Sequence, residues 1–406
     1  MPNLNINLLY FASSELHTGT WGGARLKSMI DIFEQLGVNI HLLSYILKDK
    51  IKIEDKQKGD FLKTTIIYFS KSLPKFLKVL GIPLIFMYGL KYVKRSDIIF
   101  AHSPGITTGF PAVVLAKMFN KPLIIDYMDV RAPDTPIFIH NVVLKNSTVV
   151  FAISHYLVDE TKRYGCENIV YLPTFVDTNL FKVEMNARKR IRADLRIEDD
   201  DVVIGYAGSF WYVEGVSNLL QAFKNLLKSY SNIKMIIIGG KKYKIDADIP
   251  KLVKDLNLEG KVTVVPPQPH KNVPTFLSAC DIMCCPKIDC EINRVANPIK
   301  VVEYLAMGLP TVCSAVGGIV DTIEDGVDGF LVKPGDIKDL EKMLEWIILN
   351  PERSKEIGEN GRKKAINEYS YGAIEDTIRR AISEIIDMKN GNKMGERLMN
   401  GSIIWG

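Results

Sequence analysis

A lysine, a glutamate and a pair of adjacent glycines lie close together in the second half of the chain. Lys300 and Glu303 are separated by three positions, so they share one face of the helix predicted around them. A glycine and a proline end this helix, and a short apolar strand leads to the turn at Gly317-Gly318. A glutamate can accept hydrogen bonds from ribose hydroxyls, a lysine can bind a phosphate, and a Gly-Gly turn exposes N–H groups that favour anions. The arrangement therefore suits the binding of a nucleotide sugar.

The stretch Asn297–Pro310 resembles the donor-binding segment of retaining glycosyltransferases of the GT-B fold, in glycosyltransferase family 4. The resemblance continues through 321–336, where the family has a loop, a strand, a Pro-Gly turn and a helix. It implies an α/β fold in which two Rossmann-like domains face an interdomain cleft. It also implies a hexosyltransferase type of activity, with retention at the anomeric carbon. A nucleotide diphosphate sugar would donate to a hydroxyl of a glycan, a polysaccharide precursor or a lipid-linked acceptor.

Apolar strands alternate with amphipathic helices in both halves of the chain, which predicts parallel sheets covered on both faces. A length of 406 residues favours two domains. The helix after the first strand is predicted to bury Leu26, Met29, Ile30, Phe33 and Leu36. The predicted organisation is an N-terminal acceptor-binding domain (1–182), a linker (183–200), a C-terminal nucleotide-sugar-binding domain (201–370), a helix that the resemblance places back on the N-terminal domain (371–388), and a disordered tail (389–406).

The second predicted domain opens on a glycine turn at Gly208-Ser209, which is assigned to donor binding. The family often places an arginine and a lysine in this turn to neutralise the diphosphate. This chain has neither, and Glu214 stands where the lysine often lies. The charge of the diphosphate is therefore expected to be met by Lys300 and Arg294, together with N–H groups around Gly208 and the Gly317-Gly318 turn.

The first predicted domain offers a glycine pair and two candidate catalytic side chains. Gly22 and Gly23 follow the first strand and would let the backbone approach a phosphate or the acceptor; a tight turn is the alternative. Asp129 and His102 follow later strands and are the catalytic candidates beside Lys300. The family often has a His-Asp pair where this chain has Met128 before Asp129. Helix capping for Asp129 and a structural role for the histidine remain alternatives.

The family's second signature, two glutamates separated by seven residues, is incomplete. Val295 stands at the position of the first glutamate, as in a subset of the family with the form Pro-x-Lys-x-x-Glu-Tyr. Which group contacts the hydroxyls of the donor sugar is therefore left open, with Glu291 as one candidate. Asp246-Ala247-Asp248 resembles a metal-binding Asp-x-Asp but is interpreted as a helix cap. We expect neither a metal nor a resident cofactor.

The net charge of +5 is modest and favours a phosphorylated substrate or an anionic membrane over nucleic acid. Six basic residues flank apolar ones within 71–95, which suits contact with an anionic membrane surface; a core-facing helix with a solvated face is the alternative. The six cysteines lack a paired C-x-x-C, and no secretion signal or transmembrane run is found. We therefore expect a cytoplasmic protein with peripheral membrane contact.

Other activities remain open at this stage. A GT-B epimerase or phosphorylase would share the same segments. A non-catalytic binder of nucleotide sugars would account for the missing arginine, lysine and glutamate. A nicotinamide-dependent oxidoreductase is disfavoured, because no G-x-G-x-x-G follows the first strand of either half.

Overall fold

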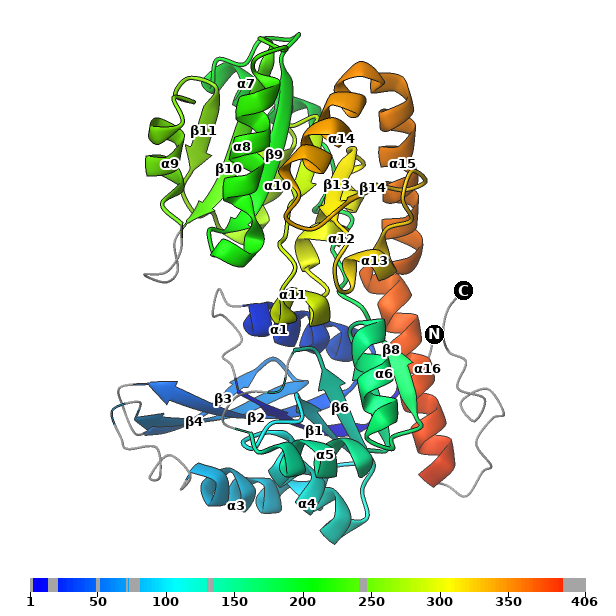
Figure 1. Ribbon diagram of the computed structural model, residues 1–406. Coiled ribbons are helices and arrows are strands. Elements are labelled where there is room, and N and C mark those ends of the chain that lie inside the picture. Colours follow the sequence, from blue (N-terminus) through cyan, green and yellow to red (C-terminus); the bar gives the residue numbers. More distant parts are fainter. Residues whose placement is uncertain are drawn as a thin grey trace. The chain divides into compact units, whose positions relative to one another are not determined.

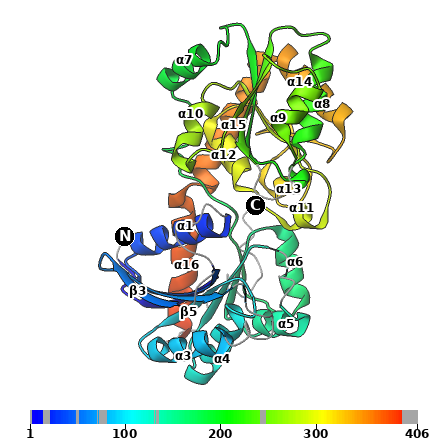
Figure 2. The same cartoon turned by 90° about the vertical axis from the view of Figure 1, so that its left-hand side faces the viewer.

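The computed structural model describes residues 3–13, 21–48, 52–70, 72, 81–129, 131, 135–240 and 247–389 (Figure 1). The chain separates into two compact units. Unit 1 contains the described residues up to Leu172 and those from Glu375 onward, and unit 2 contains Pro173–Ile374. Each unit has a largely parallel sheet with helices on both of its faces (Figures 1 and 2). The predicted α/β class with two Rossmann-like domains is confirmed.

The sheet of unit 1 has the strand order β3-β4-β2-β1-β5-β6-β7-β8 among the described residues. Among the strand pairings that the structure describes, only that of β3 with β4 is antiparallel. The strands are β1 (Asn7–Ala12), β2 (Asn39–Lys48), β3 (Lys52–Lys58), β4 (Leu62–Ser70), β5 (Ile98–His102), β6 (Leu123–Tyr127), β7 (Val149–Ala152) and β8 (Ile169–Tyr171). The central strands β5, β6 and β7 are buried along their whole length, as expected for parallel strands covered on both sides.

The helices of unit 1 divide between the two faces of its sheet. They are α1 (Trp21–Gln35), α3 (Gly81–Val93), α4 (Gly109–Phe119), α5 (Ile137–Lys145), α6 (His155–Arg163) and the part of α16 (Tyr371–Lys389) from Glu375 onward. The connection through α1 runs from β1 toward one edge of the sheet, whereas the connections through α3, α4 and α5 run toward the other edge. Because such crossovers are right-handed, α1 lies on the opposite face of the sheet from α3, α4 and α5 (Figure 2). The predicted apolar face of α1, from Leu26 to Leu36, is buried.

The sheet of unit 2 is parallel throughout, in the order β11-β10-β9-β12-β13-β14. Its strands are β9 (Val202–Ser209), β10 (Ile233–Gly240), β11 (Val262–Val265), β12 (Ile282–Cys285), β13 (Thr311–Ser314) and β14 (Phe330–Val332). Its helices are α7 (Met185–Asp194), α8 (Val216–Leu226), α9 (Ile249–Asp255), α10 (Val273–Leu277), α11 (Glu291–Val295), α12 (Ile299–Met307), α13 (Ile319–Thr322), α14 (Ile337–Leu349) and α15 (Pro351–Glu368), with short 3-10 turns η1 (Tyr212–Glu214) and η2 (His270–Asn272). Alternate strand residues such as Ile236 and Ile237 enter separate apolar clusters on the two faces.

The organisation of the chain differs from the prediction around the proposed linker. The segment 183–200 contains helix α7, and the two units separate earlier, between Leu172 and Pro173. Arg188 and Arg192 of α7 bind the carboxylate of Asp281, at 2.5 and 3.2 Å. The charged composition that suggested a linker therefore reflects ion pairs that dock α7 within unit 2.

Several smaller predictions also have an outcome. Asp248 caps α9 by accepting a hydrogen bond from the N–H of Lys251, as predicted, while Asp246 lies outside the described residues. All six cysteines are free, and only Cys290 is not buried. The last helix ends at Lys389, and the tail predicted to be disordered lies beyond the described residues.

Candidate functional site

Gly208 is the second-last residue of β9 and lies beside the amine of Lys300. A Cβ atom at Gly208 would lie 2.4 Å from Lys300 Nζ, so only a glycine leaves room for this lysine. The hydroxyl of Tyr206 donates to the carbonyl of Ser209 and accepts from Lys300 Nζ, at 2.7 and 3.1 Å. The structure thus brings three predicted donor-site residues, Gly208, Ser209 and Lys300, together at the carboxyl end of β9. This is the edge of a parallel sheet at which ligands bind.

Two lysines share one carboxylate at this edge. Lys300 Nζ lies 2.7 Å from Glu214 Oε2, and Lys287 Nζ lies 3.0 Å from Glu214 Oε1. Lys287 also donates to Asn293 Oδ1 at 2.9 Å. We call Lys287, Glu214 and Lys300 the lysine–glutamate bridge. Because it has two cations and one carboxylate, the bridge carries an excess of one positive charge.

The bridge residues are nearly buried but not sealed. The side chains of Lys300 and Glu214 are each 12% exposed, and that of Lys287 is 6% exposed. Burial alone would raise the pKa of Glu214, but the charges of Lys300 and Lys287 lower it to about 2. Burial would lower the pKa of Lys300, and the charge of Glu214 outweighs this and raises it. The excess positive charge is therefore present at neutral pH.

Sequence reasoning treated Glu214 as an obstacle and overlooked Lys287. The structure assigns both to the same cluster, because Lys287 follows β12, which neighbours β9 in the sheet. A lysine two residues after an apolar strand was the only signal in the sequence. Tyr304 was also overlooked; its hydroxyl accepts from the N–H of Ala207 and donates to its carbonyl, at 2.8 and 3.1 Å. These bonds fix α12, and with it Lys300, against β9.

Glu303 lies one turn from Lys300 on α12 and pairs with a histidine. Its Oε1 is 2.6 Å from His270 Nε2, and the glutamate is 5% exposed. The hydrogen bond with Glu303 raises the pKa of His270 against the lowering effect of burial. The His270 side chain is 62% exposed and packs on Phe181, with ring centroids 5.1 Å apart. The pair holds a buried carboxylate in one orientation.

The Gly317-Gly318 turn packs closely on α11 and the start of α12. A Cβ at Gly317, where φ is +58°, would lie 2.1 Å from the carbonyl oxygen of Asn293. The N–H of Gly318 donates to the carbonyl of Ala296 at 2.9 Å. That N–H was expected to face an anion, and the structure uses it inside the protein instead. Close backbone packing is the observed reason for these glycines.

Arg294, the other predicted phosphate ligand, lies in a different environment from Lys300. Its Nε and Nη2 bind the two oxygens of Asp289 at 2.7 and 2.8 Å, and its side chain is 59% exposed. The bond with Arg294 lowers the pKa of Asp289. Sequence proximity to Lys300 suggested a shared role, but α11 directs this guanidinium to a neighbouring carboxylate.

Unit 1 has a second buried charge cluster. Arg25 of α1 binds Asp126, near the end of β6, with Nη2 2.7 Å from Oδ1 and Nε 2.9 Å from Oδ2. Arg25 Nη2 also donates to the carbonyl of Leu172 at 3.2 Å. Burial alone would raise the pKa of Asp126, but the Arg25 charge holds it well below its usual range. The ion pair fastens the start of α1, where Gly22 and Gly23 lie, to the carboxyl end of the sheet.

The structure brings His102 to Asp126 and not to Asp129. His102 and Asp126 are directly opposite in the pairing of β5 with β6, and His102 Nδ1 lies 3.5 Å from Asp126 Oδ2. His102 is buried, and its Nε2 has no hydrogen-bond partner among the described residues. Asp129 lies two residues after β6 and is exposed. Asp126, which ends the same predicted strand, was not selected from the sequence.

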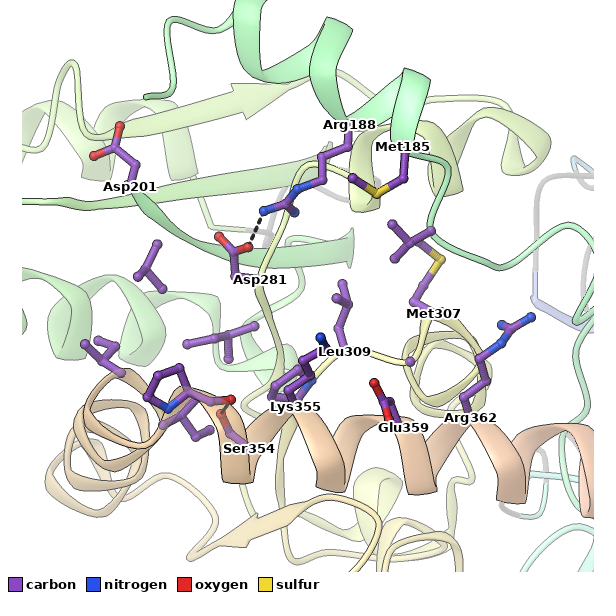
Figure 3. A pocket seen from close by; sticks show the side chains of 18 of the residues that line it. Met185, Arg188, Asp201, Asp281, Met307, Leu309, Ser354, Lys355, Glu359 and Arg362 are labelled. Carbon is purple, nitrogen blue, oxygen red and sulfur yellow. Dashed lines mark hydrogen bonds and ion pairs between the residues drawn. The ribbon is translucent and has the colours of Figure 1, made fainter. Parts of the chain in front are cut away.

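A cavity of about 790 Å³ lies at the opposite, amino end of the unit 2 sheet (Figure 3). Its lining combines apolar residues such as Leu309 with charged residues of α7 and α15. Arg188 points toward Asp281 across one side, and Lys355 and Glu359 reach it from α15 (Figure 3). Because it adjoins the starts of β9 and β12, this cavity is separate from the lysine–glutamate bridge.

Comparison with known proteins finds similar sequences and similar folds. Residues 187–364 match the family model described as Glycosyl transferases group 1. The chain is 25% identical over 238 residues to the capsular polysaccharide biosynthesis glycosyltransferase CapM of Staphylococcus aureus. That match covers 57% of this chain and 60% of the relative, so the chain spans about three fifths of its length.

Two solved structures share the fold over nearly the whole chain. The sucrose-phosphate synthase of Thermosynechococcus elongatus has a TM-score of 0.77 at 18% identity, covering 94% of this chain and 100% of the other. HepE of Anabaena, solved in complex with UDP, has a TM-score of 0.73 at 18% identity, covering 93% and 100%. At this identity the likeness shows the fold, and the predicted GT-B class is confirmed.

Proposed function

We propose that this protein is a retaining glycosyltransferase that moves a sugar from a nucleotide diphosphate sugar to a hydroxyl of a glycan, a polysaccharide precursor or a lipid-linked acceptor. The observation that carries the proposal is the lysine–glutamate bridge, which sets an excess positive charge at the carboxyl ends of β9 and β12. The proposal is supported by the match of residues 187–364 to the Glycosyl transferases group 1 model and by HepE, which was solved with UDP. It also agrees with the name of CapM, a capsular polysaccharide glycosyltransferase.

In this proposal Lys300 binds the diphosphate. An ammonium group has three donors, and Lys300 uses two of them on Glu214 and Tyr206. The third is available to a phosphate oxygen, and Lys300 is the more exposed lysine of the bridge. Negative charge on the diphosphate grows as the bond to the sugar breaks, so a fixed cation stabilises the transition state more than the ground state. Lys287 acts as a positioning residue that keeps Glu214 from neutralising Lys300 completely.

Glu303 is proposed to accept hydrogen bonds from the ribose hydroxyls. Its bond to His270 uses one carboxylate oxygen, and a carboxylate has several acceptor positions. On the acceptor side, His102 and Asp129 remain the proposed catalytic residues, with Gly22 and Gly23 as the backbone that approaches a phosphate or the acceptor. The buried Arg25–Asp126 pair holds this backbone in place.

We propose that the reaction needs no divalent metal, because lysine charges are available for the diphosphate. The described part of the chain holds no group of three or more His, Cys, Asp or Glu side chains arranged for a metal ion. Turnover should therefore persist after exhaustive EDTA treatment. Activity that disappears and then returns on addition of magnesium or manganese would contradict this part of the proposal.

One observation favours a second candidate, a non-catalytic binder of nucleotide sugars. Glu214 cancels one of the two lysine charges, and Arg294 is bound to Asp289, so less free positive charge faces a leaving diphosphate. A thermal-shift screen with UDP, GDP, ADP and dTDP sugars identifies the nucleotide, because binding to the native state raises Tm. Turnover with the best donor and an acceptor panel then separates the enzyme from the binder. Acceptor-independent isomerisation or phosphate-dependent cleavage would instead indicate an epimerase or a phosphorylase.

We further propose a cytoplasmic location with contact to an anionic membrane through 71–95. Among the described residues, no helix has both the length and the apolar character that crossing a bilayer requires. Only Ser72 and the residues from Gly81 onward are described in this segment. Helix α3 exposes Met87 and carries Lys91 in its last turn, which supports a peripheral contact.

A further inference from the structure

Three neighbouring helices of unit 1 carry no carboxylate. Helix α4 packs between α3 and α5 on one face of the sheet (Figure 1). Neither aspartate nor glutamate occurs in 81–95, 109–121 or 137–145, which contain the three helices and the residues that follow α3 and α4. Helix α6 of the same unit, by contrast, contains Asp159 and Glu160 beside its basic residues. We call the exposed surface of α3, α4 and α5 the three-helix face.

Cations line one end of this face. Each helix has a lysine in its last turn, namely Lys91, Lys117 and Lys145. The three helices connect parallel strands and so run in the same direction, which places their last turns at the amino edge of the sheet. Lys94, Arg95 and Lys121 follow α3 and α4 at the same edge, and none of the six cations forms an ion pair within the described chain. A helix dipole favours a terminal lysine but does not account for the missing carboxylates.

Large apolar side chains are exposed on the same helices. Met87 of α3, Met118 of α4 and Phe138 of α5 are 64%, 60% and 64% exposed, and Ile137 and Val142 of α5 are also exposed. A single exposed apolar residue is ordinary on a protein surface. Several on three adjacent helices that carry cations and, within themselves, no carboxylate form an amphipathic surface.

We propose that the three-helix face docks on an anionic lipid surface. Lysines attract anionic headgroups, and methionine and phenylalanine side chains enter the boundary between headgroups and acyl chains. A nucleic acid would use the cations but would leave the exposed apolar side chains in water. The proposal extends beyond the segment 71–95, because α4 and α5 contribute half of the cations and most of the exposed apolar residues. It uses no residue of the donor site, so it stands independently of sugar transfer.

The test is co-sedimentation of the full chain with phosphatidylcholine vesicles, with and without phosphatidylglycerol. We expect binding only with phosphatidylglycerol, weakened by salt. The triple variant Lys91→Glu, Lys117→Glu, Lys145→Glu should lower vesicle partitioning by roughly 100-fold, because each lysine near an anionic surface contributes several-fold. The pair Met118→Ser, Phe138→Ser should also lower partitioning but should leave its salt dependence unchanged.

The matched control is Lys251→Glu, Lys254→Glu, Lys342→Glu, which changes net charge equally at exposed positions of unit 2. This control should bind vesicles like the wild type. Two results with vesicles would overturn the proposal: an equal loss of vesicle binding in both triple variants, or no binding of the wild type to either kind of vesicle. It would also be overturned if the protein formed a dimer and the variants of the three-helix face dissociated this dimer without changing vesicle binding. Thermal shift with nucleotide sugars, measured on every variant, verifies folding and reports separately on the proposed donor site.

Discussion

The two units each bury a carboxylate at the carboxyl end of their sheet, but they neutralise it differently. In unit 1, the guanidinium of Arg25 occupies both oxygens of Asp126, and the side chains are 4% and 0% exposed. In unit 2, Glu214 is shared by Lys287 and Lys300, and the side chains are 6–12% exposed. The first cluster is neutral and closed, and the second retains a positive charge and some access to solvent.

The difference follows from the chemistry of the cations. A guanidinium is a planar fork that satisfies a carboxylate with two parallel bonds, so the pair leaves little for a ligand. An ammonium is a point charge that contacts one oxygen and keeps donors in reserve. A buried charge cluster alone therefore does not indicate a ligand site. The excess positive charge and the unused N–H donors of the lysine–glutamate bridge distinguish it from the Arg25–Asp126 pair.

The largest expected effect comes from removing Arg25 from its buried ion pair with Asp126. Arg25→Met leaves Asp126 as a buried, uncompensated charge and should lower the free energy of unfolding of unit 1 by about 3–5 kcal/mol. Urea denaturation measures this loss. Lys287→Met is the matched control. It should lower the free energy of unfolding by less, because Glu214 keeps Lys300 as a partner. Equal losses would remove the distinction between the two clusters, whereas Arg25→Met with Asp126→Leu should recover stability.

The same pair sets a pH dependence. The native pKa of Asp126 is below its ordinary value of about 3.9, so its stabilisation is present above that pH and is lost as pH falls toward the native pKa. The double variant Arg25→Met, Asp126→Leu should lack this acid-dependent loss. Identical acid unfolding of the double variant and the wild type would assign the effect to other carboxylates.

The next effect concerns the open bridge. Lys300→Ala should lower kcat by roughly 10²–10³-fold, the scale of removing one donor that stabilises transition-state charge. Lys300→Arg should recover part of this, because the charge returns in another shape. Steady-state kinetics with a saturating donor measures both, with the exposed Lys342→Ala as the control. If kcat of Lys300→Ala stays within a few-fold of the wild type, another residue must stabilise the charge of the diphosphate. Arg294 is then the next residue to test.

Glu303→Ala should weaken nucleotide binding by about 1–3 kcal/mol, the range for a lost charge-assisted hydrogen bond. Calorimetric titration with the preferred nucleoside diphosphate measures this. Glu303→Gln keeps one hydrogen-bond acceptor and should therefore lose less nucleotide affinity than Glu303→Ala. Wild-type affinity in a folded Glu303→Ala protein would show that this carboxylate serves only His270.

The smallest effect is expected at the exposed partner of that glutamate. The bond with Glu303 raises the pKa of His270 above its ordinary value, so its stabilisation is present at low pH and is lost as pH rises through the raised value. Melting temperatures from pH 6 to 9 should therefore decline less for His270→Asn than for the wild type. The two profiles would coincide if the exposed imidazole contributed nothing.

Much of the fold could be predicted because parallel strands and amphipathic helices have strong local patterns. The buried face of α1 and the Lys300–Glu303 spacing on α12 are examples in which neighbours in sequence are neighbours on one helix. The linker prediction failed where a local signal was misleading. The charged stretch around α7 pairs with Asp281, about ninety positions away, and nothing near it in the sequence marks that partner.

The sequence by itself determined the class of the protein: two parallel α/β halves, with Lys300 and Glu303 on one face of a helix. Only the tertiary structure decided which charges meet. Glu214 joins residues 73 and 86 positions away, and Arg25 reaches Asp126 across 101 positions. The physical reason is that strand order, and not distance along the chain, determines which strand ends are adjacent. Because β12 lies beside β9, Glu214 is the anchor of a cationic site and not an obstacle to it.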